Sequence, residues 1–230
     1  MRNPPHAGAT TRDAASRAVK VSAGEVVLEG SLALPGEARG VVLFAHGSGS
    51  SRLSPRNRYV AQVLHDGDLG TLLIDLLTSE EEERDERTGE LRFDIPLLAK
   101  RLVGATGWLG REAATRGLPV GYFGASTGGG AALVAAAEFP EAARAVVSRG
   151  GRPDLARAAL PLVEAPTLLI VGGLDTAVIR MNREALAQLR CEKRLEIVPG
   201  ATHLFEEPGA LEAVARLACE WFRRHLGPGR

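Results

Sequence analysis

The segment that decides the fold is YFGASTGGG at residues 122–130, which contains the pattern Gly-x-Ser-x-Gly centred on Ser126. An apolar run at residues 120–123 leads into it, and an alanine-rich run at residues 131–137 follows it. A serine at a tight turn from strand to helix is held in a strained conformation with its hydroxyl above the sheet, and flanking glycines let backbone segments approach closely. Loops of small residues match the pattern by chance, so its place between a strand and a helix is what gives it weight.

Apolar runs and helical patterns alternate along most of the chain. Two segments of alternating polarity, residues 19–22 and 26–34, predict an antiparallel hairpin with one wet face. Continuous apolar runs predict strands covered on both faces at residues 41–45, 71–74, 120–123, 145–147, 167–171 and 195–198. Apolar residues at helical spacing predict helices at residues 58–65, 95–109, 127–138, 179–189 and 211–226. The alternation predicts an α/β fold with a mostly parallel, doubly wound sheet and an N-terminal antiparallel hairpin.

Length and composition predict one globular domain over residues 17–230, preceded by a flexible arm over residues 1–16. The 28 basic and 28 acidic residues cancel, so no overall positive field attracts nucleic acid or an anionic membrane. Cys191 and Cys219 lack metal-ligand or redox spacing, and we expect buried thiols in a reducing compartment, with a disulfide as the alternative. The chain shows no signal-peptide pattern and no membrane-spanning run. We therefore expect a cytoplasmic protein, either a monomer or a homodimer.

A run of charged residues interrupts the pattern at residues 80–87, where the sequence is EEEERDER. We expect a solvated loop before the next helix, and the alternative is an acidic docking site. The chain contains no internal repeat that would alter the prediction of one domain.

Three reactive side chains fall just beyond the carboxyl ends of predicted strands, namely those of Ser126, Asp175 and His203. Ligands bind at that edge of open α/β sheets because loops and helix N-termini converge there. The chain order serine, aspartate, histidine suits acyl transfer. His203 would take the proton of Ser126, and Asp175 would orient the imidazole and stabilise the imidazolium. The alternatives are that Asp175 only caps the following helix and that His203 is only a hydrogen-bonded loop residue.

Backbone N–H groups on two sides of the serine are candidate donors to an oxyanion. One belongs to Thr127, where a helix begins and directs a partial positive charge toward Ser126. The second belongs to the loop after His46, and Ser48 is the candidate there. We expect His46 to brace this loop, with substrate binding as the alternative. The residues call for no metal and no organic cofactor.

Four motifs together resemble those of the α/β-hydrolase superfamily and, within it, of the small proteins grouped with the dienelactone hydrolases. The motifs are FAHGSG (44–49), GASTG (124–128), GGLD (172–175) and PGATH (199–203). The resemblance covers residues 19–226 and implies an α/β-hydrolase fold without a lid, with Ser126, Asp175 and His203 as the triad. Dienelactone hydrolases proper use a cysteine nucleophile, and the serine here favours a general carboxylesterase. Some relatives carry a fused phosphoribosyltransferase domain, for which we expect no room in this chain.

Specificity is harder to predict. Between residues 147 and 167, where many proteins of this fold insert a lid, the sequence predicts only a short helix. Without a lid to cover a long acyl chain, we expect small or water-soluble esters as substrates. Arg149 stands at a strand end, where it either binds a substrate carboxylate or pairs with Glu206 or Glu207.

We predict a serine hydrolase that cleaves carboxylic esters through an acyl-enzyme, and other classes stay open. One is a catalytically silent interaction domain on the same fold, in which Ser126 would not react with a fluorophosphonate. Another is a nucleotide-binding module, because GSGSSR at residues 47–52 follows a strand and Asp75 ends the next one, although Arg52 replaces the third glycine. Acyl transfer or a carbon–oxygen lyase reaction on the same triad also stays open.

Overall fold

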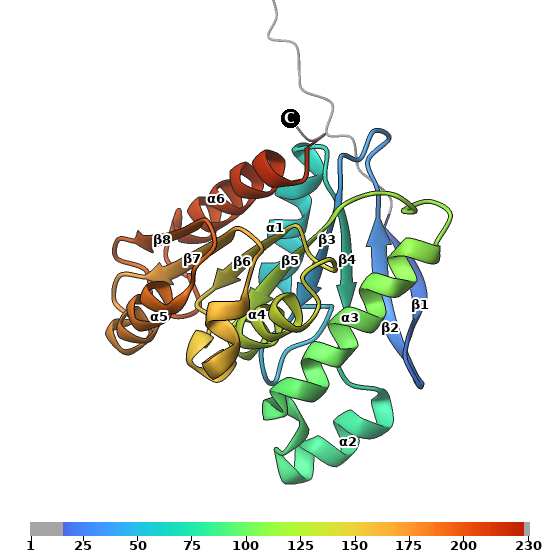
Figure 1. Cartoon of the computed structure of the whole chain (residues 1–230), viewed down its shortest axis with the longest axis horizontal. Coiled ribbons are helices and arrows are strands. Elements are labelled where there is room, and N and C mark those ends of the chain that lie inside the picture. The colour runs from blue at the N-terminus through green and yellow to red at the C-terminus, as the bar shows by residue number, and fades with distance from the viewer. Residues whose placement is uncertain (1–15, 228–230) are drawn as a thin grey trace, which may run out of the picture.

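The computed structural model describes residues 16–227 and confirms the predicted α/β fold. The strands are β1 (Arg17–Ala23), β2 (Val26–Ala33), β3 (Val41–Ala45), β4 (Gly70–Ile74), β5 (Val120–Ala125), β6 (Ala145–Arg149), β7 (Thr167–Gly172) and β8 (Lys193–Val198). They form one sheet in the order β1-β2-β4-β3-β5-β6-β7-β8 (Figure 1). β2 pairs antiparallel with β1 and β4, and the other neighbouring strands are parallel. Of the arm predicted over residues 1–16, only Ser16 lies within the described residues.

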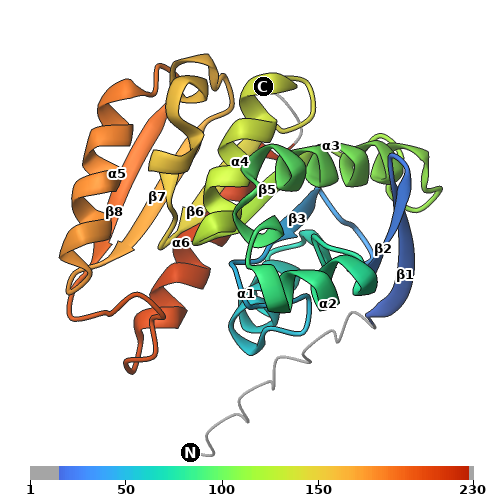
Figure 2. The same ribbon diagram turned by 90° about the horizontal axis from the view of Figure 1, so that it is seen from below.

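Helices cover both faces of the sheet, which is why its central strands are apolar throughout. The helices are α1 (Pro55–Asp66), α2 (Ser79–Thr88), α3 (Ile95–Arg111), α4 (Thr127–Glu138), α5 (Thr176–Gln188) and α6 (Ala210–His225), with 3₁₀ segments η1 (Leu91–Phe93) and η2 (Pro153–Leu162). Figure 2 shows α3, α4 and α5 on one face, with α1 and α6 on the other. Every residue of β3 to β7 is buried, as expected for strands enclosed on both sides.

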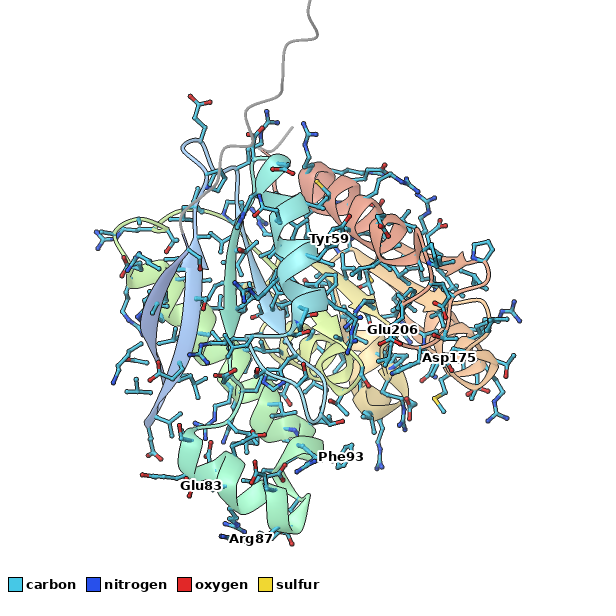
Figure 3. All side chains as sticks on the ribbon, turned by 180° about the vertical axis from the view of Figure 1, so that it is seen from behind. Tyr59, Glu83, Arg87, Phe93, Asp175 and Glu206 are labelled. Atoms are coloured by element: carbon cyan, nitrogen blue, oxygen red, sulfur yellow. The ribbon has the colours of Figure 1, made fainter. Side chains whose placement is uncertain are left out.

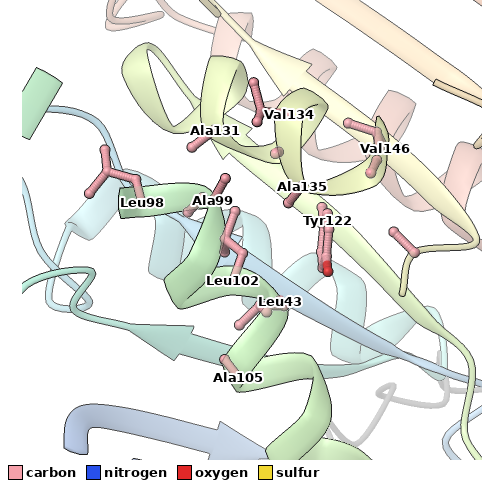
Figure 4. Close-up of a cluster of buried hydrophobic side chains, with 14 of the residues drawn as sticks. Leu43, Leu98, Ala99, Leu102, Ala105, Tyr122, Ala131, Val134, Ala135 and Val146 are labelled. Atoms are coloured by element: carbon pink, nitrogen blue, oxygen red, sulfur yellow. The ribbon is translucent and has the colours of Figure 1, made fainter. Parts of the chain in front are cut away.

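The core beneath α3 and α4 holds α4 close to the sheet. Leu43 of β3 and Tyr122 of β5 belong to the same cluster as Leu102 of α3 and Ala135 of α4 (Figure 4). The Tyr122 hydroxyl donates to Thr106 Oγ1 at 2.8 Å, since the Thr106 hydroxyl itself donates to the Leu102 carbonyl. Burial raises the pKa of Tyr122 to about 12. The alanine side chains of α4 are buried in this core, and its glycine-rich first turn, residues 127–130, approaches the end of β3 closely.

The connection from β6 to β7 is short. Within the described chain, η2 is its only helical segment. Nothing in this connection forms a separate layer above the sheet, which agrees with the expectation of a fold without a lid. This connection therefore leaves the carboxyl ends of β6 and β7 without a lid.

The acidic run at residues 80–87 forms most of α2, so the loop predicted there is wrong. The helix begins with a capping box that binds two otherwise unpaired N–H groups. Thr78 Oγ1 accepts from the Glu81 N–H at 3.2 Å, and the Glu81 carboxylate accepts from the Thr78 N–H at 2.8 Å. Acidic residues in the first turn also lie at the positive end of the helix dipole, which stabilises the helix further.

One acidic residue of α2 is buried and paired. Glu83 and Arg87 extend away from the protein (Figure 3), whereas Asp85 is only 1% exposed. Asp85 accepts hydrogen bonds from the Leu91 N–H at 2.6 Å and from Arg92 Nε at 2.5 Å. Burial alone would raise the pKa of Asp85, but the Arg92 guanidinium and the backbone donors outweigh it and lower the pKa. This carboxylate therefore fastens α2 to the segment that follows it.

Two predictions from composition can be compared with the described residues. No helix within residues 16–227 has the length and apolar character needed to cross a membrane. Cys191 and Cys219 are free and half-buried, and burial raises the pKa of both thiols. Their free state agrees with the predicted thiols, and the compartment stays a prediction.

Candidate active site

Ser126 occupies the turn between β5 and α4 and is held in an unusual conformation. Its φ of 50° and ψ of −120° lie in a region that residues with a side chain rarely adopt. The Ser126 N–H donates to the Arg149 carbonyl at 3.2 Å. The Ser126 carbonyl accepts from the N–H groups of Gly129 and Arg152, at 2.9 and 3.0 Å. These bonds tie the strained turn to the end of β6, as the predicted strand-to-helix turn requires.

The glycines on either side of Ser126 are required by close backbone contacts. A Cβ on Gly124 would lie 2.5 Å from the Gly128 carbonyl oxygen, and one on Gly128 would lie 2.2 Å from the Ala45 carbonyl oxygen. Both distances are far shorter than van der Waals contact. The turn therefore fits between β3 and α4 only because these positions lack side chains.

Asp175 and His203 form the hydrogen bond that the sequence predicts. His203 Nδ1 lies 2.7 Å from Asp175 Oδ2, and the two side chains are 40% and 15% exposed. Asp175 stands at the N-cap position of α5, but its side chain makes no capping bond. The alternative that Asp175 only caps a helix is therefore wrong. Because a carboxylate only accepts, it fixes the proton of His203 on Nδ1 and leaves Nε2 available as a base.

The backbone at the end of β6 links the histidine to the serine. Gly150 directly follows Arg149, whose carbonyl binds the Ser126 N–H. A Cβ on Gly150 would lie 3.5 Å from two atoms of the His203 ring, so the imidazole packs against this residue. Within residues 16–227, no hydrogen bond joins the Ser126 hydroxyl to His203. Catalytic hydrogen bonds are often long before substrate binds, so the proton transfer between these two groups stays a prediction.

The loop after β3 crosses directly over Ser126. A Cβ on Gly47 would lie 3.1 Å from Ser126 Cβ, which places this loop against the serine. The Ser48 N–H donates to Thr127 Oγ1 at 2.9 Å and so fastens the loop to the start of α4. Thr127 is the first residue of α4, and the first N–H groups of a helix have no intrahelical acceptor. Both predicted oxyanion donors thus lie beside the serine, one of them bound to a neighbouring hydroxyl.

His46 braces this loop from the side. Its Nε2 accepts from the Leu76 N–H at 3.0 Å, so the ring proton resides on Nδ1, which donates to the Gly47 carbonyl at 2.9 Å. Burial lowers the pKa of His46, which favours this neutral form. Both ring nitrogens are engaged inside the protein, as the bracing role requires, so neither is available to a substrate in this arrangement.

Arg149 forms neither of the ion pairs considered for it. Glu206 lies 3.3 Å from Arg56 instead, and the Glu207 carboxylate accepts from the Thr202 N–H at 3.0 Å. Arg149 is 8% exposed, and its guanidinium lies 5.9 Å from the centroid of the Phe205 ring. The pairing alternative is therefore wrong, and a buried guanidinium remains at the end of β6.

The features of a nucleotide site do not come together. Asp75, the candidate ribose ligand, accepts from the Arg52 N–H at 2.6 Å and from Arg52 Nη1 at 2.7 Å. The helix after the glycine-rich segment begins only at Pro55, beyond Ser54, whose hydroxyl caps it. Residues 47–52 therefore do not lead directly into a helix N-terminus as a dinucleotide fingerprint does. Among the described residues, no cluster of three or more His, Cys, Asp or Glu side chains could hold a metal ion.

Two further residues shape the site without a sequence signal. Phe205 is 1% exposed and adopts a φ of 57°, which is strained for a large side chain. The Arg149 guanidinium lies over its ring. Gly150, with a φ of 52°, provides the surface on which the imidazole rests. Neither the phenylalanine nor this glycine belongs to a recognisable motif, so only their place near the strand ends could have indicated them.

Known proteins resemble the chain in sequence and fold. The model of the dienelactone hydrolase family matches residues 78–226. A dienelactone hydrolase from Anabaena variabilis ATCC 29413 is 69% identical, with a TM-score of 0.90 over 92% of this chain and 98% of that chain. Est1E from Butyrivibrio proteoclasticus is 15% identical with a TM-score of 0.75, covers 91% of this chain and 98% of its own, and shares the fold alone.

Longer relatives occur in Mycobacterium tuberculosis. Proteins of the strains CDC 1551 / Oshkosh and ATCC 25618 / H37Rv are 60% identical over 212 residues, which is 92% of this chain. Each is provisionally named a phosphoribosyl transferase. This chain spans about half the length of these relatives, 47% of each.

Proposed function

The chain belongs to the dienelactone hydrolase family, and from this premise we propose that it hydrolyses carboxylic esters through an acyl-enzyme on Ser126. The observation that carries the proposal is the hydrogen bond between His203 Nδ1 and Asp175 Oδ2, beside a serine in a strained turn. A serine hydroxyl is a poor nucleophile without a base, and this imidazole is oriented with Nε2 free.

Acylation would begin with attack by Ser126 Oγ on the ester carbonyl carbon while His203 Nε2 takes the hydroxyl proton. Asp175 stabilises the imidazolium that forms. The tetrahedral intermediate collapses when the carbon–oxygen bond to the alcohol breaks, and the His203 proton passes to the leaving oxygen. Water then attacks the acyl-enzyme with His203 again as base, which releases the carboxylic acid and regenerates Ser126.

The oxyanion of each intermediate would be bound by backbone N–H groups of Thr127 and Ser48. The Ser48 N–H already points toward the start of α4, where Thr127 Oγ1 accepts it. An oxyanion formed beside Ser126 would accept a hydrogen bond from the Ser48 N–H, either together with Thr127 Oγ1 or in its place. One such donor supplies roughly 3 kcal/mol of transition-state stabilisation.

The short β6–β7 connection supports small or water-soluble esters as substrates. η2 is the only helical segment described there, so no lid encloses a long acyl chain above the strand ends. The predicted preference therefore concerns size and polarity rather than one particular ester.

The test is the variant Ser126→Ala, assayed on para-nitrophenyl acetate. We expect hydrolysis to be abolished, because no other described side chain replaces the hydroxyl beside His203. Ser22→Ala, which removes an exposed hydroxyl on β1, is the matched control and should retain full turnover. Labelling of the wild type, but not of Ser126→Ala, by a fluorophosphonate would support the acyl-enzyme. Turnover retained in Ser126→Ala would refute the proposal, and an unlabelled wild type would favour the catalytically silent alternative.

A further inference from the structure

A cavity of about 340 Å³ lies between α1 and the part of the sheet formed by β2 and β4. Small-molecule sites occupy roughly 300–1,000 Å³, so this space is large enough for a ligand. Thr71, near the amino end of β4, lines its floor, whereas Ser126 follows the carboxyl end of β5. The described residues that line the cavity include no member of the candidate triad and neither predicted oxyanion donor. A ligand bound there would therefore be separate from the ester substrate.

The cavity exists because the sheet extends beyond α1 and small side chains line the gap. Figure 3 shows α1 beside the edge strands β1 and β2 rather than over them. Ala33 of β2, which pairs with Thr71, and Ala61 of α1 contribute only methyl groups to the walls. Leu73 of β4 adds a larger apolar surface. The inner part of the cavity can therefore bury a short apolar group.

Hydrogen-bond donors without partners surround this apolar floor. Arg58 of α1 lines the cavity and is exposed, and it forms no ion pair within the described chain. The side chains of Ser31 on β2 and Gln62 on α1 also line it, and neither makes a hydrogen bond to another described residue. A cation, a hydroxyl and an amide from two sides of the cavity are thus available to an acceptor.

Arg52 brings a second guanidinium to the same space in a fixed position. Its Nη1 donates to Asp75 Oδ2 at 2.7 Å, and its backbone N–H donates to Asp75 Oδ1 at 2.6 Å. The other guanidinium N–H groups remain available to a ligand. Asp75 itself lines a neighbouring cavity together with Glu29 and Glu82. No carboxylate of the described residues lines the cavity beside Arg52, so only cationic side chains contribute formal charge to its walls.

We propose that this cavity binds a small organic oxyanion, a carboxylate or a phosphate monoester on a short apolar stem. The oxyanion would pair with the guanidinium groups of Arg58 and Arg52, because a guanidinium fork matches both kinds of anion. The Ser31 hydroxyl would donate a further hydrogen bond, and the stem would lie against Ala33 and Ala61. The inference goes beyond the proposed ester hydrolysis and does not depend on it.

The test is isothermal titration calorimetry of the full chain with n-butyl phosphate and with pentanoate, which carry the same butyl stem. Inorganic phosphate is the head group alone, and sodium chloride keeps the ionic strength equal in all titrations. For wild type we expect saturable binding of an organic anion, and the tighter of the two identifies the head group. If n-butyl phosphate binds, it should bind more tightly than inorganic phosphate, because the stem is buried. Arg58→Gln should weaken the binding about tenfold or more, the equivalent of one charge-assisted hydrogen bond.

Two further variants locate the site. Arg183→Gln is the matched control, because it removes the same charge from an exposed position on α5, and it should bind the anion as wild type does. Ser31→Val replaces the cavity hydroxyl with a side chain that suits a strand, and it should also weaken binding. The inference is overturned if wild type binds neither organic anion, or if Arg58→Gln binds as tightly as wild type.

A last comparison separates this cavity from the candidate active site. Ser126→Ala should bind the anion with wild-type affinity, whether or not the wild type hydrolyses esters. Binding that is lost in Ser126→Ala and kept in Arg58→Gln would place the anion at the serine and refute the cavity as its site. Failure of ester hydrolysis would leave the calorimetric result intact, so the two proposals fail independently.

Discussion

The variant Asp175→Asn separates catalysis from stability at this site. The Asp175 carboxylate accepts the His203 Nδ1 proton at 2.7 Å and makes no capping bond to α5. An asparagine offers either an amide oxygen, a weaker acceptor for an imidazolium, or an NH₂ group, which forces the ring proton onto Nε2. In either case Ser126 loses an effective base. The loss in a comparable triad is about 10⁴-fold in kcat, which corresponds to roughly 5.4 kcal/mol of transition-state stabilisation.

The same substitution should change stability little. Asparagine is as good as aspartate at an N-cap position, and one hydrogen bond contributes about 1 kcal/mol net. For a protein of this size that amounts to a shift of about 2–4 °C in melting temperature. Activity should therefore fall by orders of magnitude in a protein that remains folded.

The assay is kcat/KM for para-nitrophenyl acetate, with melting temperature measured on the same preparations. Asp154→Asn is the matched control, because Asp154 pairs with Arg152 at 2.7 Å and holds no catalytic group. We expect wild-type kcat/KM from the control. If Asp175→Asn keeps kcat/KM within about tenfold of wild type, less than 1.4 kcal/mol is lost and the triad reasoning fails.

Other predictions concern the turn, the acidic helix and the buried tyrosine. Gly128→Ala would place a Cβ 2.2 Å from the Ala45 carbonyl oxygen, so we expect a loss of several kcal/mol in denaturant unfolding, and wild-type stability would contradict the backbone contact. Thr78→Ala removes the capping box with Glu81 and should cost about 1 kcal/mol, seen as faster amide hydrogen exchange in α2. The raised pKa of Tyr122, about 12, means that its stabilising contribution is complete below pH 10 and is lost as pH rises toward 12. The unfolding free energies of wild type and Tyr122→Phe should therefore converge between pH 10 and pH 12. If the two free energies keep a constant difference across these pH values, the raised pKa of Tyr122 is contradicted.

The fold was predictable because burial on both faces leaves a direct trace in the sequence. Continuous apolar runs at residues 41–45 and 167–171 became parallel strands that are buried throughout, and alternating polarity at residues 26–34 became an antiparallel strand beside the edge of the sheet. Helix ends were predicted less well. α1 begins at Pro55 rather than residue 58, since Ser54 caps it and proline is favoured in the first turn.

The error at α2 has a physical cause. Its acidic sequence lacks an apolar stripe, so periodicity predicted no helix. Thr78 and Glu81 nevertheless stand at capping-box spacing, a signal that was present in the sequence. The pairing of Asp85 with Arg92 was not predictable, because it depends on how the chain turns after the helix.

Part of the candidate site was also predictable from the sequence, and part depends on tertiary contacts. Positions at strand ends indicated Asp175 and His203, and their hydrogen bond follows from two parallel neighbours, β7 and β8, that end side by side. The sequence left Arg149 between a substrate role and an ion pair. Only the placement of Glu206 beside Arg56 decides against the pair, and that is a tertiary contact.

Several departures from ordinary folding rules lie at the carboxyl end of this sheet. Ser126 and Phe205 adopt positive φ angles, and two guanidinium nitrogens of Arg149 are buried without a hydrogen-bond partner. Each costs stability and persists only because the surrounding contacts determine it. Two other residues have a positive φ elsewhere: Asp68, whose side chain tolerates that conformation in a turn, and Arg157 in η2. Ser126, Phe205 and the unpaired nitrogens of Arg149 lie near the His203–Asp175 pair. This coincidence is expected where a protein retains local strain for chemistry rather than for folding.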